Sequence, residues 1–230
     1  LKSKKIKWHF QEIPHDVWNY DLAAAPILTM VKRNDQLVDV VVSVSKLGNV
    51  LIFERESGKP IFDIIYERAP VSNIPGERTS DYQVNIKLPE QICRSKFNTN
   101  ELTKFDDDFV ETFNKDISNY NFGYPSPPLI GKKTISIGSC VRWAGGSVDT
   151  NKNILYITSD NVASIISIVK NDDEKFSYYH EWDTFSDNDG YPAIKPPWGA
   201  ITALNLNTGK IIWKKPFGKI KELEEKNIFN

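Results

Sequence analysis

An internal repeat constrains the fold of this chain more than any other feature of the sequence. Residues 201–213 read ITALNLNTGKIIW, residues 51–62 read LIFERESGKPIF, and residues 3–8, SKKIKW, look like the end of the same unit. Each unit has an apolar run, polar residues, Thr/Ser-Gly-Lys, and a second apolar run that ends in an aromatic residue. Gly58 and Gly209 can adopt the positive φ of a tight turn, so each unit predicts a β-hairpin.

The spacing of these units favours a β-propeller. The aromatic residues that end them, Trp8, Phe62 and Trp213, lie 54 and 151 residues apart, and the second gap is close to three times a repeat of about 50 residues. Repeats of about 40–50 residues built from short antiparallel strands are typical of propeller blades. The alternative is a set of unrelated hairpins in a β-sandwich. At this spacing the 230 residues correspond to about four or five blades.

Strand-type sequence dominates the rest of the chain. Short runs rich in Val and Ile, flanked by Gly, Asn, Asp or Lys, occur at residues 38–44, 50–53, 134–137, 154–157, 165–169 and 201–206. Two segments favour helices instead. Residues 106–117 place Phe109 and Phe113 on one face behind a run of Asp, and residues 219–226 form a short charged candidate. We therefore expect an all-β fold in which helices are minor elements.

Composition excludes several classes of function. The 29 basic and 30 acidic side chains give a net charge of −1, so nucleic acid and anionic lipid are not attracted to the chain as a whole. The longest apolar stretch, residues 22–31, is broken by Pro26 and is far shorter than the roughly 20 residues of a membrane-spanning helix. The chain opens without Met and without the apolar run of a signal peptide, so we expect its N-terminus to be missing.

The two cysteines leave the redox compartment open. Cys93 and Cys140 lie 47 residues apart, and no CxxC pair suggests a zinc or thioredoxin-type site. A disulfide between them and two free thiols both fit the sequence.

Two motifs carry a resemblance to a known family. Residues 8–27, WHFQEIPHDVWNYDLAAAPI, fit WxxQxxxHDxWDxD followed by small residues and Pro, except at Asn19. Residues 46–59, KLGNVLIFERESGK, are similar to K-x-G-x-x-x-x-x-D-R-x-x-G. Together they resemble the pyrroloquinoline quinone (PQQ)-dependent dehydrogenases, eight-bladed quinoprotein propellers that oxidise alcohols or aldose sugars. Further segments match in order: 76–83, 93–97, 124–131, 143–149 and 190–213.

The resemblance implies that residues 1–230 are part of one propeller domain, with no separate second domain. The matched segments cover roughly the second half of a family member, without its last blade. We therefore expect an arc of about four blades, each a four-stranded antiparallel sheet, from an eight-bladed parent. The remaining blades would come from the rest of the protein, and the fragment alone would be inactive.

The function that the resemblance implies is PQQ-dependent oxidation of an alcohol or aldose sugar. Electrons would pass to ubiquinone or a cytochrome, in the periplasm, with possible membrane association through the missing N-terminal part. The family also uses Ca²⁺, held largely by residues upstream of this segment. The alternative is a non-catalytic propeller that serves as a scaffold, like the outer-membrane assembly lipoproteins built from the same repeats.

The family base directly follows the motif Trp, and the corresponding residue here is Asn19. An amide cannot take a proton at neutral pH, and general base catalysis is worth about 10²–10⁴-fold. Asp21 is the candidate substitute, because residues two apart on a strand share a face, whereas Asp16 would face the other way. For both Asp16 and Asp21 the alternative is hydrogen bonding in a turn or at a strand end.

Lys46 matches a cation that contacts the quinone oxygens in the family. It follows Asn19 by 27 residues, the spacing of the sugar-oxidising branch. A cation there would stabilise the negative charge that develops on the quinone; a solvated Lys at a strand end is the alternative.

Other polar residues are weaker candidates. Thr158 falls where the family often places an Asn that binds the cofactor, Asn161 is its rival, and a core or turn role fits both. Residues 187–190, DNDG, look like a calcium loop, but Pro196 falls where such a loop needs a bidentate Glu. A turn rich in Asp and Asn is therefore expected, and we assign no metal ligand to the chain.

Overall fold

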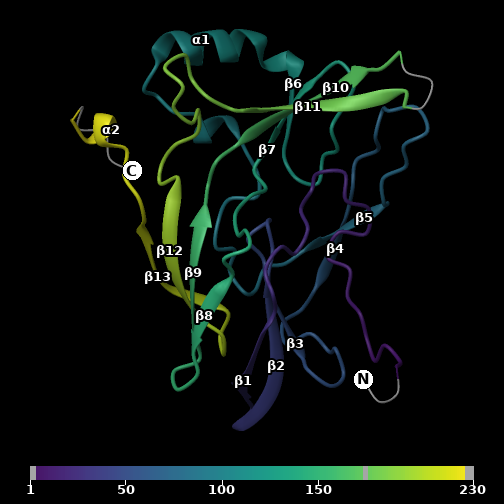
Figure 1. Ribbon diagram of the computed structural model, residues 1–230, viewed down its shortest axis with the longest axis vertical. Coiled ribbons are helices and arrows are strands. Elements are labelled where there is room, and N and C mark those ends of the chain that lie inside the picture. Colours follow the sequence, from purple (N-terminus) through teal and green to yellow (C-terminus); the bar gives the residue numbers. More distant parts are fainter. Residues whose placement is uncertain (1–3, 173–175, 226–230) are drawn as a thin grey trace.

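The computed structural model describes residues 4–172 and 176–225, and most of their regular structure is β-strand (Figure 1). Within this part of the chain the strands form two four-stranded sheets, one three-stranded sheet and one two-stranded hairpin. The prediction of an all-β fold containing part of a propeller is confirmed.

Two antiparallel sheets lie next to each other and correspond to the repeated units. The first has the order β1-β2-β3, with bounds Ile27–Arg33, Gln36–Val44 and Val50–Glu54. The second has the order β13-β12-β9-β8, and its strands are β8 (Gly146–Asp149), β9 (Ile154–Asp160), β12 (Gly199–Asn205) and β13 (Lys210–Pro216). Val40, Val42 and Val44 of β2 are buried at every second position, as the alternation of a strand requires. They pack in one core with Leu155 and Ile157 of β9.

The repeated turns have the predicted geometry. Gly58 and Gly209 have φ values of 73° and 71°, and each donates its amide to the carbonyl four residues earlier. The hydroxyls of Ser57 and Thr208 accept a hydrogen bond from the amide of the Lys that follows each Gly. The first residue of the remaining unit, residue 3, lies outside the described residues.

The aromatic residues show which units are neighbours. Trp8 packs on Gly58, where an added Cβ would lie 2.5 Å from its ring, and Phe62 packs on Gly209, where the corresponding distance is 3.1 Å. The unit that ends in Phe62 is therefore adjacent to the unit containing Gly209. The long sequence gap between Phe62 and Gly209 holds further sheet structure, and the chain then returns to the neighbouring unit.

A third sheet and a hairpin account for much of that gap. The sheet has the order β11-β10-β7-β6, with bounds β6 (Tyr120–Phe122), β7 (Lys133–Ser136), β10 (Ser164–Lys170) and β11 (Tyr178–Thr184). Strand β6 runs parallel to β7, which departs from the all-antiparallel expectation. The chain leaves one sheet after β9, forms β10 and β11 in the other, and returns at β12 (Figure 1). The hairpin consists of β4 (Ile65–Arg68) and β5 (Tyr82–Asn85).

The helices are short and close to their predicted positions. Helix α1 (Asp107–Asp116) begins after Asp106, whose carboxylate accepts a hydrogen bond from the amide three residues on, and it buries Phe113. Helix α2 (Lys221–Glu225) is shorter than predicted, and residue 226 lies outside the described part of the chain. Two 3₁₀ turns cover Thr99–Glu101 and Ile117–Asn119. None of the described helices has the length and hydropathy that crossing a membrane requires.

Candidate functional site

The segment that carries the family motif is irregular, not a strand. Asp16 accepts hydrogen bonds from the amides of Trp18 (2.9 Å) and Tyr20 (2.7 Å), and Asn19 between them has a φ of 66°. Asn tolerates this left-handed conformation better than most residues. The predicted turn role of Asp16 is confirmed. The premise that Asn19 and Asp21 share the face of a strand is wrong, because the Asp16 carboxylate takes the amides that a strand would use.

Buried aromatic residues anchor this segment. Trp18 donates from Nε1 to the carbonyl of Ser126 (2.8 Å), and the Tyr20 hydroxyl lies 2.5 Å from Ser136 Oγ. The two rings stack with centroids 5.9 Å apart. Burial raises the pKa of Tyr20 to about 12, so its hydroxyl stays protonated at neutral pH. These contacts fix the backbone on both sides of Asn19.

Lys46 meets both candidate residues of the motif segment. Its ammonium lies 2.5 Å from Asp21 Oδ1, 3.2 Å from the Asn19 carbonyl oxygen and 3.4 Å from Asn19 Oδ1. The Lys46 side chain is 12% exposed, whereas that of Asp21 is 54% exposed. The structure therefore brings together three residues that the sequence singled out, and Lys46 is not the solvated lysine of the alternative.

A buried carboxyl that sequence reasoning missed lies beside the Lys46 turn. Glu12 Oε1 accepts hydrogen bonds from Ser45 Oγ (2.9 Å) and Asn49 Nδ2 (2.8 Å). Burial raises the pKa of Glu12 to about 7, although these two bonds oppose the shift. Only a tertiary contact buries this residue, so no local pattern in the sequence could have revealed it.

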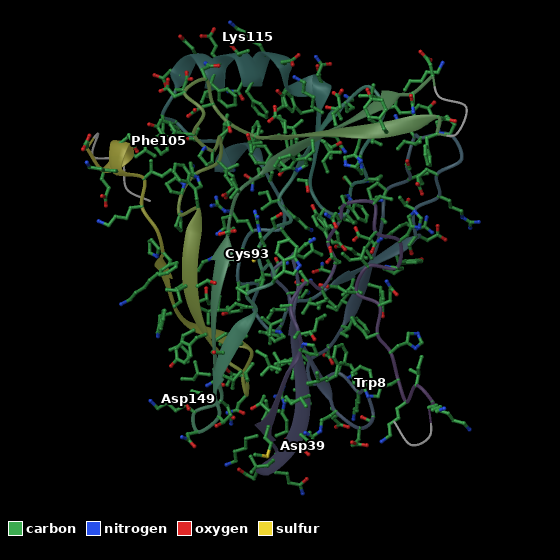
Figure 2. The ribbon with its side chains drawn as sticks, in the orientation of Figure 1. Trp8, Asp39, Cys93, Phe105, Lys115 and Asp149 are labelled. Atoms are coloured by element: carbon green, nitrogen blue, oxygen red, sulfur yellow. A yellow bond between two sulfur atoms is a disulfide. The ribbon has the colours of Figure 1, made fainter. Side chains whose placement is uncertain are left out.

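Cys93 and Cys140 form a disulfide that packs against Gly48, in the same turn as Lys46. Their Cα atoms are 6.1 Å apart, and Figure 2 places Cys93 near the middle of the molecule. The Cys140 amide donates to the Lys46 carbonyl (3.0 Å), and the Ile92 amide donates to the Gly48 carbonyl (3.0 Å). The structure thus selects the disulfide from the two alternatives that the sequence left open.

A cavity of about 790 Å³ adjoins the motif segment. Asn19 lines it, as do Ile166 and Ile168 of β10 and His180 and Trp182 of β11. Across the two strands Ile166 pairs with Trp182, and Ile168 with His180, so alternate positions of each strand form one wall. Lys46, Asn19 and Asp21 form what we call the Lys46 cluster. Among these three described residues, Asn19 is the one that lines the cavity. The cavity combines an apolar and aromatic wall with a few polar groups, as small-molecule sites do.

The motif segment is also tied to the loop on the far side of the cavity. His15 Nε2 and Glu77 Oε1 are 2.7 Å apart, and Glu77 lines the cavity. This contact joins two of the segments that shape the cavity.

Thr158 and Asn161 are not brought into the Lys46 cluster. Thr158 is exposed on β9, opposite Ile201 of β12. Asn161 is buried; its Oδ1 accepts a hydrogen bond from the Arg94 amide (2.9 Å), and its own amide donates to the Trp198 carbonyl (2.6 Å). Neither lines the cavity formed by the described residues. Asn161 therefore has the core role that was one of its two sequence-based alternatives. A cofactor contact remains a prediction for both Thr158 and Asn161.

Residues 187–190 form the predicted turn. The Asp187 carboxylate accepts hydrogen bonds from the amides of Asp189 (3.2 Å) and Tyr191 (2.8 Å), and the Gly190 amide donates to the Asp187 carbonyl (3.1 Å). The turn therefore uses Asp187 to bind its own backbone.

Comparison with known proteins identifies relatives along nearly the whole chain. A family model described as the β-propeller domain of PQQ glucose/ethanol/alcohol dehydrogenases matches residues 1–229. The quinate/shikimate dehydrogenase (quinone) of Acinetobacter baylyi is 24% identical over 95% of this chain and 30% of its own length. The quinoprotein glucose dehydrogenase of Escherichia coli K12 is 24% identical over 93% of this chain and 30% of its own length.

A solved structure shows the same kind of fold. The quinohemoprotein alcohol dehydrogenase from Comamonas testosteroni is 16% identical, with a TM-score of 0.50 over 92% of this chain and 27% of the solved chain. This chain thus spans about 30% of the length of the curated relatives above. Because the family model covers residues 1–229, the chain belongs to the β-propeller family of PQQ glucose/ethanol/alcohol dehydrogenases.

Proposed function

We propose that the full-length protein containing this chain is a PQQ-dependent dehydrogenase that oxidises an alcohol or an aldose sugar and passes the electrons to ubiquinone or a cytochrome. The observation that carries the proposal is the position of Lys46. It sits in its family motif and meets the base position, Asn19, from a part of the chain 27 residues away. Bound PQQ would accept hydride from the substrate.

The chemistry of Lys46 fits a quinone oxygen as its ligand. Its ammonium carries three donors. Two make contacts of 2.5 and 3.2 Å, with Asp21 and with the Asn19 carbonyl, and these orient the group. The contact with Asn19 Oδ1, at 3.4 Å, is longer than an ordinary N–H···O bond, so this donor can turn to a ligand oxygen. Lys46 is thus a residue of this chain that would hold the cofactor.

The cavity beside Asn19 supports a role in binding the substrate. Trp182 and the isoleucines of β10 can contact the carbon skeleton of an alcohol or sugar, and His180 and Glu77 can bind its hydroxyls. Asp21 is 54% exposed and contacts Lys46. Its role as the substitute base stays a prediction.

The disulfide supports the proposed periplasmic location, because disulfides persist in oxidising compartments and are rare in the cytosol. A Ca²⁺ ion held mostly by residues outside this chain, and membrane association through the N-terminal part of the full-length protein, belong to the same proposal.

The scaffold is the second candidate, and Asn19 is the observation that favours it. Asn19 places an amide where a dehydrogenase of this family has its base, and that amide cannot accept a proton at neutral pH. Loss of the base with retention of the fold is what a propeller kept for binding partners would show.

Dye-linked oxidation tests the proposal. We expect the full-length protein, loaded with PQQ and Ca²⁺, to reduce an artificial dye with an aldose or an alcohol. Lys46→Ala should lower kcat by about 10²-fold, because it removes the charge that would stabilise the quinone oxygens. Lys115→Ala is the matched control, since Lys115 also pairs with a carboxylate but lies on α1. Equal turnover of Lys46→Ala and wild type would contradict the assigned role of Lys46.

The isolated 230-residue chain is expected to be inactive. The described sheets are part of a propeller, and the remaining blades, which would pack against them to close the ring, come from the rest of the protein. Without the remaining blades the chain cannot enclose a quinone or keep water away from it. Reduction of the dye by the isolated chain with PQQ and any alcohol or sugar would show this expectation to be wrong.

A further inference from the structure

The residues at the two ends of the turn that carries Lys46 donate hydrogen bonds to the same carboxyl oxygen. This turn, residues 45–49, joins β2 to β3. Glu12 Oε1 accepts from Ser45 Oγ at 2.9 Å and from Asn49 Nδ2 at 2.8 Å. The backbone closes the same loop, because the Ser45 amide donates to the Asn49 carbonyl (3.1 Å). Lys46 lies inside the closed loop, so these contacts limit where its backbone can move.

These bonds are sheltered from water. Glu12 is 4% exposed, Asn49 is 2% exposed and Ser45 is 0% exposed. A hydrogen bond in such a place holds geometry better than an exposed one, because breaking it leaves a buried polar group without a partner. Glu12 also belongs to the motif segment that presents Asn19 and Asp21. It therefore joins the two stretches of chain that meet at the Lys46 ammonium.

The remaining sides of the turn are fixed independently. Gln91 Nε2 donates to Asn49 Oδ1 (3.0 Å), so the Asn49 amide is held at both its oxygen and its nitrogen. The disulfide packs on Gly48, where an added Cβ would lie 2.5 Å from Cys93 Sγ. With these sides fixed, the contact with Glu12 ties the turn to the motif segment.

We propose that Glu12 is a positioning residue for Lys46, acting through Ser45 and Asn49. Only the expected effect on PQQ binding rests on the proposed function. The restraint that Glu12 places on Lys46 does not depend on a cofactor. The hydrogen bonds from Ser45 and Asn49 are accepted by the same Glu12 oxygen, so the carbonyl oxygen of an amide side chain could accept both. Glu12→Gln keeps such an oxygen and should preserve the turn, whereas Glu12→Ala removes it.

Amine labelling tests the proposal on the full-length protein without PQQ. Reductive methylation with formaldehyde and a borohydride, followed by mass spectrometry, measures the modification rate of Lys46 relative to Lys59. We expect Glu12→Ala to raise this rate roughly tenfold, and Glu12→Gln to stay within about twofold of wild type. Asp187→Ala is the matched control, because Asp187 is also a buried carboxyl that holds a turn; it should leave the Lys46 rate unchanged.

Three results would overturn the proposal: an unchanged Lys46 rate in Glu12→Ala, a Glu12→Gln rate as high as that of Glu12→Ala, or an equal rise in Asp187→Ala. If Glu12→Ala does not fold, the double variant Ser45→Ala/Asn49→Ala takes its place. That variant removes both donors and leaves Glu12 intact; it should give the same roughly tenfold rise, and no rise overturns the proposal.

A PQQ titration of the same variants separates this inference from the proposed function. If wild type binds PQQ, Glu12→Ala should bind it roughly tenfold more weakly, and equal affinity overturns the positioning role. If wild type binds no PQQ while the labelling rates change as expected, the proposed function fails and the hold of Glu12 on Lys46 stands.

Discussion

Asn19→Asp is expected to raise the turnover of the full-length enzyme by about 10²–10⁴-fold. Asn19 occupies the base position and lines the cavity, and a carboxylate there can accept the proton that an amide cannot. The φ of 66° does not oppose the change, because Asp also tolerates left-handed backbone. Lys46 lies 3.4 Å from Asn19 Oδ1, so the new carboxylate gains an ion-pair partner without movement of the backbone.

A pH–rate profile with two further variants checks this prediction. Asp21→Asn in the wild-type background should abolish turnover if Asp21 acts as the substitute base, and full turnover would place the base outside this chain. In the Asn19→Asp background, Asp21→Asn should leave the gain in place. No gain from Asn19→Asp in a protein that binds PQQ would contradict the assignment of the base position.

Removal of the disulfide is expected to lower the free energy of unfolding by about 4 kcal/mol. Cys93 and Cys140 are 47 residues apart, and cross-linking a loop of this length removes about that much chain entropy from the unfolded state. The double variant Cys93→Ala/Cys140→Ala, compared with wild type in denaturant without reductant, measures the loss.

Reductant provides the control for that experiment. A dithiol should lower the denaturation midpoint of wild type toward that of the double variant and should leave the midpoint of the double variant unchanged. Equal midpoints of wild type and the double variant would show that the cross-link does not restrain the unfolded chain. A higher Lys46 labelling rate in the double variant is also expected, since the Lys46 carbonyl accepts from the Cys140 amide.

Local chemistry could be predicted from the sequence where neighbouring residues decide it. The Gly58 and Gly209 turns depend on positive φ at one residue, and the start of α1 depends on the Asp106 cap. The meeting of Lys46 with Asn19 followed from the family motif, because their places in a shared fold are fixed together.

Features set by distant parts of the chain could not be predicted in the same way. The gap between Phe62 and Trp213 predicted intervening sheet structure, but the packing of Phe62 on Gly209 could not be predicted, because it is a tertiary contact between segments far apart in sequence. The burial of Glu12 and the pairing of Cys93 with Cys140 are likewise products of tertiary contacts. The strand predicted around Asn19 does not form, because the Asp16 carboxylate accepts hydrogen bonds from the backbone amides of Trp18 and Tyr20.

An equilibrium titration of the full-length protein with PQQ in the presence of Ca²⁺ tests the central claim most directly. The proposed function predicts saturable binding with a Kd on the order of 1 μM or tighter, weakened in Lys46→Ala and unaffected in Lys115→Ala. Absence of binding by wild type at micromolar PQQ would contradict the dehydrogenase and favour a propeller that serves as a scaffold.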